Sequence, residues 1–137
     1  MEQISRSPKD TMSIGTSIAA TLEGGAVVVL IGALGSGKTV LTKGIALGIG
    51  VEDTVTSPSF AILNVYEGKK NLYHFDFYRL DDPVEMGEML EDYLYRRDGV
   101  TVIEWGERIM GILRGFLHVS FCISGAHRLI NVERRDG

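Results

Sequence analysis

Hydrophobic residues first recur with helical spacing and then form an unbroken apolar run. Over residues 9–22 the apolar side chains that share one helix face are Ile14, Ile18, Ala19 and Leu22. Asp10 or Thr11 is placed to cap this predicted helix. Residues 26–31 (AVVVLI) are continuously apolar, which is the pattern of a strand covered on both faces. Helical spacing returns over 38–49, so a helix is predicted to follow this strand after a short loop.

The remaining segments alternate between strands and one more helix. Further strands are predicted at 60–67, 71–78, 100–103, 116–123 and 127–133. The first two flank a short connection that contains a glycine, and the last two surround Gly125, so each of these pairs is predicted to be antiparallel. Pro83 opens a helix predicted over 83–95, with Asp81 or Asp82 as its cap. This order predicts an α/β fold in which helices flank a mixed β-sheet.

Composition and charge narrow the possible functions. The chain has 137 residues, a formal net charge of -4 at pH 7 and a pI near 5.3, and its length predicts a single small domain over 1–137. A mildly acidic domain is a poor candidate for binding nucleic acid on its own, because the phosphate backbone requires clustered cations. The single cysteine, Cys122, excludes an internal disulfide and a Cys-rich zinc cluster. Since no apolar run suits a membrane helix or a signal peptide, we expect no membrane association and a cytoplasmic location.

The segment 32–39, GALGSGKT, matches the phosphate-binding pattern G-x-x-x-x-G-K-[ST] between a predicted buried strand and a predicted helix. Its glycines allow backbone angles and close approaches that a side chain would block, so that amides can point at phosphate oxygens. Lys38 supplies a positive charge to the β- and γ-phosphates, and the Thr39 hydroxyl is placed to ligate Mg²⁺. The pattern therefore predicts a P-loop NTPase-like fold with ATP or ADP and Mg²⁺ as ligands. The predicted nucleotide-binding residues of the loop are Gly32, Gly35, Ser36, Gly37, Lys38, Thr39 and Val40.

Two acidic residues stand where predicted strands end, and a phosphoryl-transfer site needs such a group near the cation. Glu104 directly follows an apolar strand, and Asp76 lies in a strand with a period of two residues. Each has a plainer interpretation: Glu104 as a surface acid that starts the next helix, and Asp76 as a buried carboxylate paired with Arg79 or His74. His74 is interpreted as a core histidine, and Trp105 as a packing residue.

Four motifs stand in a fixed order along the chain: GALGSGKT, SPSF at 57–60, YHFDFYRL at 73–80 and VIEWGER at 102–108. Together they resemble the TsaE (YjeE) family, the small ATPase component of the bacterial machinery that makes threonylcarbamoyladenosine in tRNA. The resemblance runs from about Thr11 to the C-terminal strand pair. Ala33 stands where the family usually has an acidic residue, and SPSF replaces the usual SPTF. In the family this segment is a switch-like loop, whose polar members here are Ser57 and Ser59.

The resemblance implies a role for individual residues. Lys38 would bind phosphate, and Thr39 and Glu104 would hold Mg²⁺. Asp76 would be needed for hydrolysis, by orienting water or by coupling to the metal. The catalytic residues implied are thus Asp76, Glu104 and Lys38. Arg128 would contact the nucleotide from the last strand pair, although a solvated charge on an edge strand is the plainer interpretation of this arginine.

The resemblance also implies protein partners. These are TsaD, the transferase that attaches the threonylcarbamoyl group to an adenosine beside the anticodon, and TsaB, its scaffold. The ATPase would dock on their complex and use Mg²⁺-dependent hydrolysis, weak when alone, to reset it between turnovers. It would contact tRNA only indirectly, which agrees with the acidic charge of the chain.

Two other classes of protein carry the same phosphate-binding loop. A small-molecule kinase needs an acceptor pocket and usually a lid with arginines, whereas the arginines here are scattered and no insert has the length of a lid. A nucleotide-gated binding module would bind ATP and hydrolyse it negligibly. Formation of ADP without an added acceptor separates the ATPase from the kinase, and stimulation by partners separates it from the binding module.

Overall fold

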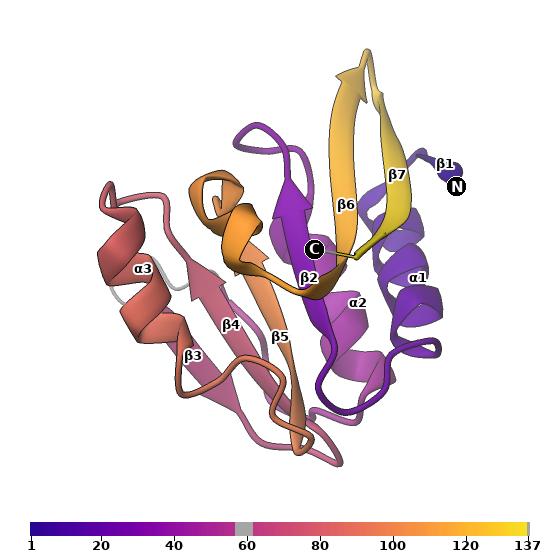
Figure 1. Ribbon diagram of the computed structural model, residues 1–137. Helices are drawn as coiled ribbons and strands as arrows, with labels where there is room; N and C mark the ends of the chain where they lie inside the picture. The colour runs from indigo at the N-terminus through magenta and orange to yellow at the C-terminus, as the bar shows by residue number, and fades with distance from the viewer. Residues whose placement is uncertain (57–61, 137) are drawn as a thin grey trace.

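Seven strands form one mixed sheet in the computed structural model, which describes residues 1–56 and 62–136. Their order across the sheet is β1-β7-β6-β2-β5-β4-β3. β2 is parallel to β5 and β6, and β4 is parallel to β5, whereas the β1–β7, β6–β7 and β3–β4 pairs are antiparallel (Figure 1). The strands are β1 (Glu2–Ser5), β2 (Val27–Ile31), β3 (Leu63–Tyr66), β4 (Asn71–Asp76), β5 (Gly99–Glu104), β6 (Gly115–Ser124) and β7 (His127–Asp136).

The helices cover both faces of this sheet. α1 (Pro8–Ala19) and α2 (Lys38–Gly48) pack together on one face, while α3 (Pro83–Leu90) and the 3₁₀ helix η1 (Glu107–Ile112) cover the other (Figure 1). The side chains of β2 divide between the two layers: Val28 and Leu30 join α1 and α2, and Val27 and Val29 join α3 and η1. A strand buried on both faces reads as a continuous apolar run, which confirms the interpretation of 26–31. The predicted α/β class is confirmed as well.

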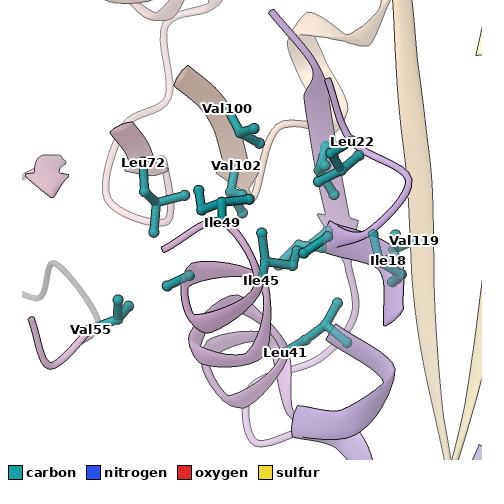
Figure 2. Close-up of a cluster of buried hydrophobic side chains, with 14 of the residues drawn as sticks. Ile18, Leu22, Leu41, Ile45, Ile49, Val55, Leu72, Val100, Val102 and Val119 are labelled. Atoms are coloured by element: carbon teal, nitrogen blue, oxygen red, sulfur yellow. The ribbon is translucent and has the colours of Figure 1, made fainter. Parts of the chain in front are cut away.

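The larger core lies between the helix pair α1–α2 and the sheet. Figure 2 shows Leu41 and Ile45 of α2 among side chains of α1 and of the strands, with Val100 and Val102 of β5 close by. Close approach of α1 and α2 depends on small residues, because a Cβ on Gly15 would lie 2.4 Å from the Leu41 carbonyl oxygen. This packing fixes the start of α2 relative to β2 and so fixes the loop between them.

Helix α1 begins earlier than predicted, and its local sequence explains why. Ser7 is the cap, since its hydroxyl accepts a hydrogen bond from the Asp10 amide at 3.0 Å. The prediction of Asp10 or Thr11 as cap is therefore wrong. Pro8 favours the earlier start, because its fixed φ suits the first helical position and its missing amide hydrogen is not needed there.

Helix α3 begins at Pro83 with Asp82 as its cap, as predicted, but it ends at Leu90 instead of continuing to residue 95. The chain turns beyond it, and Tyr95 adopts a φ of 62°. The Tyr95 hydroxyl accepts hydrogen bonds from the amides of Arg114 and Gly115, at 2.6 and 3.4 Å. These contacts to the start of β6 stabilise the turn in place of a further helical turn.

Other differences concern strand ends. β4 ends at Asp76, two residues before the predicted end at 78, and β1 is not predicted at all. The predicted strand 60–67 is described from Leu63 onward, and the motif at 57–60 with Ser57 and Ser59 lies outside the described residues. Within the described part of the chain, no helix is long and apolar enough to cross a membrane.

The sheet brings the predicted site residues to one edge. β2, β4 and β5 are parallel, so their carboxyl ends meet at the same edge, where ligands bind in open α/β sheets. Glu104 is paired in register with Leu30 of β2 on one side and with Asp76 of β4 on the other. The loop after β2 therefore begins beside both strand-end carboxylates.

Candidate functional site

The loop between β2 and α2 depends on its glycines. Gly35 and Gly37 have φ values of 77° and 108°, in the region that side chains other than glycine rarely adopt. A Cβ on Gly32 would lie 2.7 Å from the Ser36 hydroxyl oxygen and 2.9 Å from the Phe121 Cβ. The backbone of this loop can follow its path only because these positions carry no side chain.

The start of α2 is suited to an anion. Gly37 occupies the cap position and gives the first amides of the helix no side-chain hydrogen bond, and no acidic residue stands in the first turn. Such amides carry a partial positive charge and bind phosphate oxygens. Ser36 is buried, and its hydroxyl makes no hydrogen bond to the part of the chain that the structure describes. Thr39 and Val40 follow in the first turn and are partly exposed.

Lys38 is the cation of this loop. Its Nζ donates a hydrogen bond to the Gly32 carbonyl oxygen at 2.6 Å and lies 3.7 Å from the centre of the Trp105 ring. Burial holds the pKa of this amine below its usual range, while the carboxylates of Glu104, Asp76 and Glu107 act in the opposite direction. Lys38 thus has acidic neighbours from the strand ends, as the sequence predicts.

The two strand-end acids differ in their surroundings. Glu104 is only 3% exposed, so its interpretation as a surface acid is wrong. Asp76 is partly exposed, and its Oδ1 accepts a hydrogen bond from the Tyr78 amide at 2.9 Å. Burial raises the pKa of Asp76, and the neighbouring Glu104 raises it further, against the opposing effects of the Tyr78 amide, His74 and Lys38. A carboxyl group with a raised pKa in such a position is a candidate for a functional role.

His74 is a core residue whose partner was not predicted. It is fully buried on β4, and its Nε2 lies 2.5 Å from Oε2 of Glu104 on the neighbouring strand. The interpretation of Asp76 as the partner of His74 is therefore wrong. His74 Nδ1 makes no hydrogen bond within the described residues.

Arg128 reaches the loop from the far end of the sequence. Its Nη2 lies 3.4 Å from the Gly35 carbonyl oxygen. β7 is an inner strand, because β1 pairs along it with Ser5 opposite Arg128. The edge-strand part of the alternative interpretation of Arg128 is thus wrong, while its side chain remains partly exposed to solvent.

The interpretation of Trp105 purely as a packing residue missed its contact with the site. The ring lies against Lys38 and at 5.0 Å from the ring of Tyr78, and the residue has a φ of 58°. A non-glycine residue with positive φ is strained, and such strain gathers at functional sites. The sequence did contain a signal for this contact, because Trp105 directly follows Glu104 at the end of a strand.

The residues at this edge fit a magnesium nucleotide. Among the described residues, no group of three or more His, Cys, Asp and Glu is arranged to hold a metal ion. Mg²⁺ does not need such a group, because it keeps several waters and phosphate oxygens and takes one or two protein ligands. Thr39 and Glu104 offer oxygen donors of the kind this cation prefers, beside the loop that would hold the phosphates.

Comparison with known proteins identifies the family. The family described as "Threonylcarbamoyl adenosine biosynthesis protein TsaE" matches residues 5–131. The chain belongs to the TsaE family. This confirms the prediction from the sequence motifs, and it agrees with a site for a nucleotide at the loop after β2.

Individual TsaE proteins resemble the chain over most of its length. A tRNA threonylcarbamoyladenosine biosynthesis protein TsaE from Treponema pallidum is 47% identical over 109 residues, which cover 80% of this chain and 81% of that protein. The TsaE protein of Bacillus subtilis is 40% identical over 103 residues, which cover 74% of this chain and 64% of that protein. The chain therefore spans most of the Treponema relative and just under two thirds of the Bacillus relative.

A solved structure supports the fold. The crystal structure of YdiB from Bacillus subtilis superimposes with a TM-score of 0.82 at 31% sequence identity, and the match covers all of this chain and 86% of that one. The predicted P-loop NTPase-like arrangement of a mixed sheet flanked by helices is thereby confirmed.

Proposed function

We infer that this protein binds ATP and ADP and hydrolyses ATP with Mg²⁺ as the ATPase component of the machinery that makes threonylcarbamoyladenosine in tRNA. It acts in the cytoplasm on a complex of TsaB and TsaD and allows that complex to turn over repeatedly. It contacts tRNA only through these partners. Family membership supports the pathway, and the chemistry of the site supports the reaction.

One observation carries the proposal: a phosphate-binding loop leaves β2 beside two carboxylates that pair in register at the ends of the parallel strands β4 and β5. Phosphoryl transfer needs cationic groups on the phosphates and an acidic group for the cation and the attacking water. The loop supplies the first through Lys38 and the amides of α2. The strand ends supply the second through Glu104 and Asp76.

Each residue then has a distinct task. Lys38 and the loop amides bind the β- and γ-phosphates, and Arg128 contacts the nucleotide near Gly35. Thr39 and Glu104 hold Mg²⁺, which neutralises charge on the phosphates when bound. Asp76 orients a water molecule in line with the γ-phosphorus. The water oxygen bonds to phosphorus as the bond to the leaving ADP oxygen breaks, and the proton of the water passes to a phosphate oxygen.

Reconstitution tests the proposal directly. Multiple-turnover formation of threonylcarbamoyladenosine on tRNA is measured with TsaB, TsaD and this protein, alongside ADP release. The Asp76→Asn variant should bind ATP and dock on the complex yet fail to support repeated rounds. Asp98→Asn is a matched control, because Asp98 is exposed, pairs with Arg96 at 2.7 Å and precedes β5 at the opposite edge of the sheet.

The possible outcomes separate the competing functions. Absence of stimulation by the unmodified protein would refute the function in tRNA modification. Full turnover by Asp76→Asn would remove Asp76 from the mechanism. ADP release that requires a small-molecule acceptor would favour a kinase, and nucleotide-dependent docking without hydrolysis would favour a binding module.

A further inference from the structure

His74 lies behind Glu104, the proposed magnesium ligand, and has no task in the mechanism above. Both side chains are buried, at 0% and 3% exposure, and they come from neighbouring parallel strands. Glu104 is paired in register with Asp76, and His74 is paired with Val102, two positions earlier on β5. His74 therefore reaches Glu104 diagonally across the sheet, on the face that carries α1 and α2.

We propose that His74 is a positioning residue, which holds the Glu104 carboxylate in the orientation that presents its other oxygen to Mg²⁺. This inference rests on the proposed function, because orientation of Glu104 matters for nucleotide binding only if Glu104 faces the cation. His74 does not touch the nucleotide. It acts through one hydrogen bond.

The geometry of this bond supports the assignment. Nε2 lies 2.5 Å from Oε2, within hydrogen-bonding distance. A carboxylate only accepts, so Nε2 carries the hydrogen and donates it to Glu104. A carboxylate has two oxygens, and a donor fixed on one of them sets the direction of the other. Ligands of metal ions are commonly oriented by such hydrogen bonds from residues behind them.

The surroundings explain why Glu104 needs a partner. Its carboxylate stands beside Asp76, a like charge on the adjacent strand, and it is almost entirely removed from water. Like charges side by side repel, and a buried carboxylate without a donor is unfavourable. The hydrogen bond from His74 keeps the Glu104 side chain from rotating toward solvent or toward Lys38.

The choice of histidine is also informative. His74 Nδ1 makes no hydrogen bond within the described residues, so the ring is anchored by packing and by the single bond to Glu104. A purely structural polar residue at a buried position usually satisfies its polar atoms. Among the described residues only Nε2 has a partner, and that partner is Glu104, so the bond to Glu104 is the hydrogen bond that this position provides.

The test separates positioning from stability by measuring the magnesium requirement of nucleotide binding. Calorimetry gives the affinity of the full chain for adenylyl imidodiphosphate in EDTA and over a series of MgCl₂ concentrations. The His74→Phe variant fills a similar volume without a donor. It should bind the analogue normally in EDTA but need roughly 10- to 100-fold more MgCl₂ for the same gain in affinity. Emission of Trp105, the single tryptophan of the chain, gives a second readout beside Glu104.

Conservative replacement and a matched control complete the experiment. In His74→Gln the amide nitrogen falls near the place of Nε2, so this variant should need no more than about threefold extra MgCl₂, whereas His74→Asn should behave like His74→Phe. Thr101→Val is the control, because Thr101 is buried on the same strand as Glu104 and bonds elsewhere, to the Tyr93 carbonyl oxygen. It should leave the MgCl₂ requirement unchanged.

The outcomes distinguish the two proposals. The positioning role is overturned if His74→Phe folds and needs no more MgCl₂ than the unmodified protein. If His74→Phe does not fold, equal MgCl₂ requirements of His74→Gln and His74→Asn overturn it instead. Glu104→Gln is measured in parallel. If MgCl₂ no longer raises the nucleotide affinity of Glu104→Gln but still raises that of the His74 variants as in the unmodified protein, only the positioning role fails. If Glu104→Gln keeps the effect, the metal assignment fails and this inference fails with it.

Discussion

Replacement of Lys38 by methionine gives the sharpest test of the phosphate site. Lys38→Met keeps an unbranched apolar stem of nearly the same length and removes the ammonium group. In the structure this group donates to the Gly32 carbonyl oxygen at 2.6 Å and lies against Trp105. A nucleotide would offer it phosphate oxygens instead, so the variant loses the main cation of the site without opening a cavity.

The magnitude follows from the kind of bond that is lost. A hydrogen bond to a charged group contributes about 1.5–3 kcal/mol net. Part of this is offset, because Lys38 gives up its existing bond to Gly32 when it turns to the phosphates. We therefore expect a loss of about 2 kcal/mol in binding free energy, which corresponds to roughly 30-fold weaker binding of ATP and ADP.

The stability of the variant should move in the other direction. Burial lowers the pKa of Lys38 in the folded protein, so the charged form is disfavoured there relative to the unfolded chain. This cost is fully present below the folded pKa and disappears as pH rises above the unfolded pKa. Since pH 7 lies below the unfolded pKa of lysine, burial of this amine costs stability there, and Lys38→Met should unfold at the same temperature or higher.

The assay combines calorimetric titration of ADP in MgCl₂ with thermal unfolding at pH 7. Lys43→Met is the matched control, because Lys43 lies on the same helix and lines a shallow pocket with Met12 and Leu47, away from the loop. Equal ADP affinity for Lys38→Met and Lys43→Met, with both variants folded, would refute the assignment of the phosphate site.

Three further predictions concern neighbouring positions. Gly37→Ala should lower the free energy of unfolding by about 1–2 kcal/mol, because its φ of 108° disfavours a side chain. Thermal unfolding of Gly111→Ala should match that of the unmodified protein, since a Cβ there has no atom of the described residues within 4 Å. Asp76→Asn should raise the unfolding temperature at pH 7, and this gain should vanish in acid. The pKa of Asp76 is raised in the folded protein, so the cost of its carboxylate is complete above the folded pKa and disappears as pH falls below the unfolded pKa. Arg128→Gln should weaken ADP binding in calorimetry by several-fold and leave thermal unfolding unchanged.

The elements with strong hydrophobic patterns were predictable from the sequence. The run at 26–31 is apolar because β2 is covered on both faces, and the spacing over 38–49 matches the buried side of α2. β1 gave no such signal. It is short and lies at the edge of the sheet, and its apolar Ile4 remains half exposed. Backbone pairing with β7 forms this strand, and backbone pairing leaves no pattern in the side chains.

The candidate site was predictable where chemistry is local and unpredictable where it depends on register. The loop at 32–39 carries its own pattern, so Lys38 and its glycines could be named. Glu104 and Asp76 could be named because each ends a strand. The partner of His74 could not, since it is fixed by the parallel register of β4 and β5, which joins residues 30 positions apart.

Arg128 shows how the topology itself builds part of the site. It lies 93 positions after Gly35 in sequence, yet its guanidinium group lies beside that loop carbonyl. β6 is parallel to β2, and β7 returns antiparallel to β6, so the start of β7 lies at the same edge of the sheet as the end of β2. β1 then pairs with β7 and brings Ser5 opposite Arg128, while the buried Ser5 hydroxyl bonds to Thr11 of α1 at 2.7 Å. β1, which was not predicted, therefore connects Arg128 to α1, and α1 packs against α2, the helix that begins at the proposed phosphate site. The first residues of the chain thus help to fix a candidate site formed by residues far beyond them.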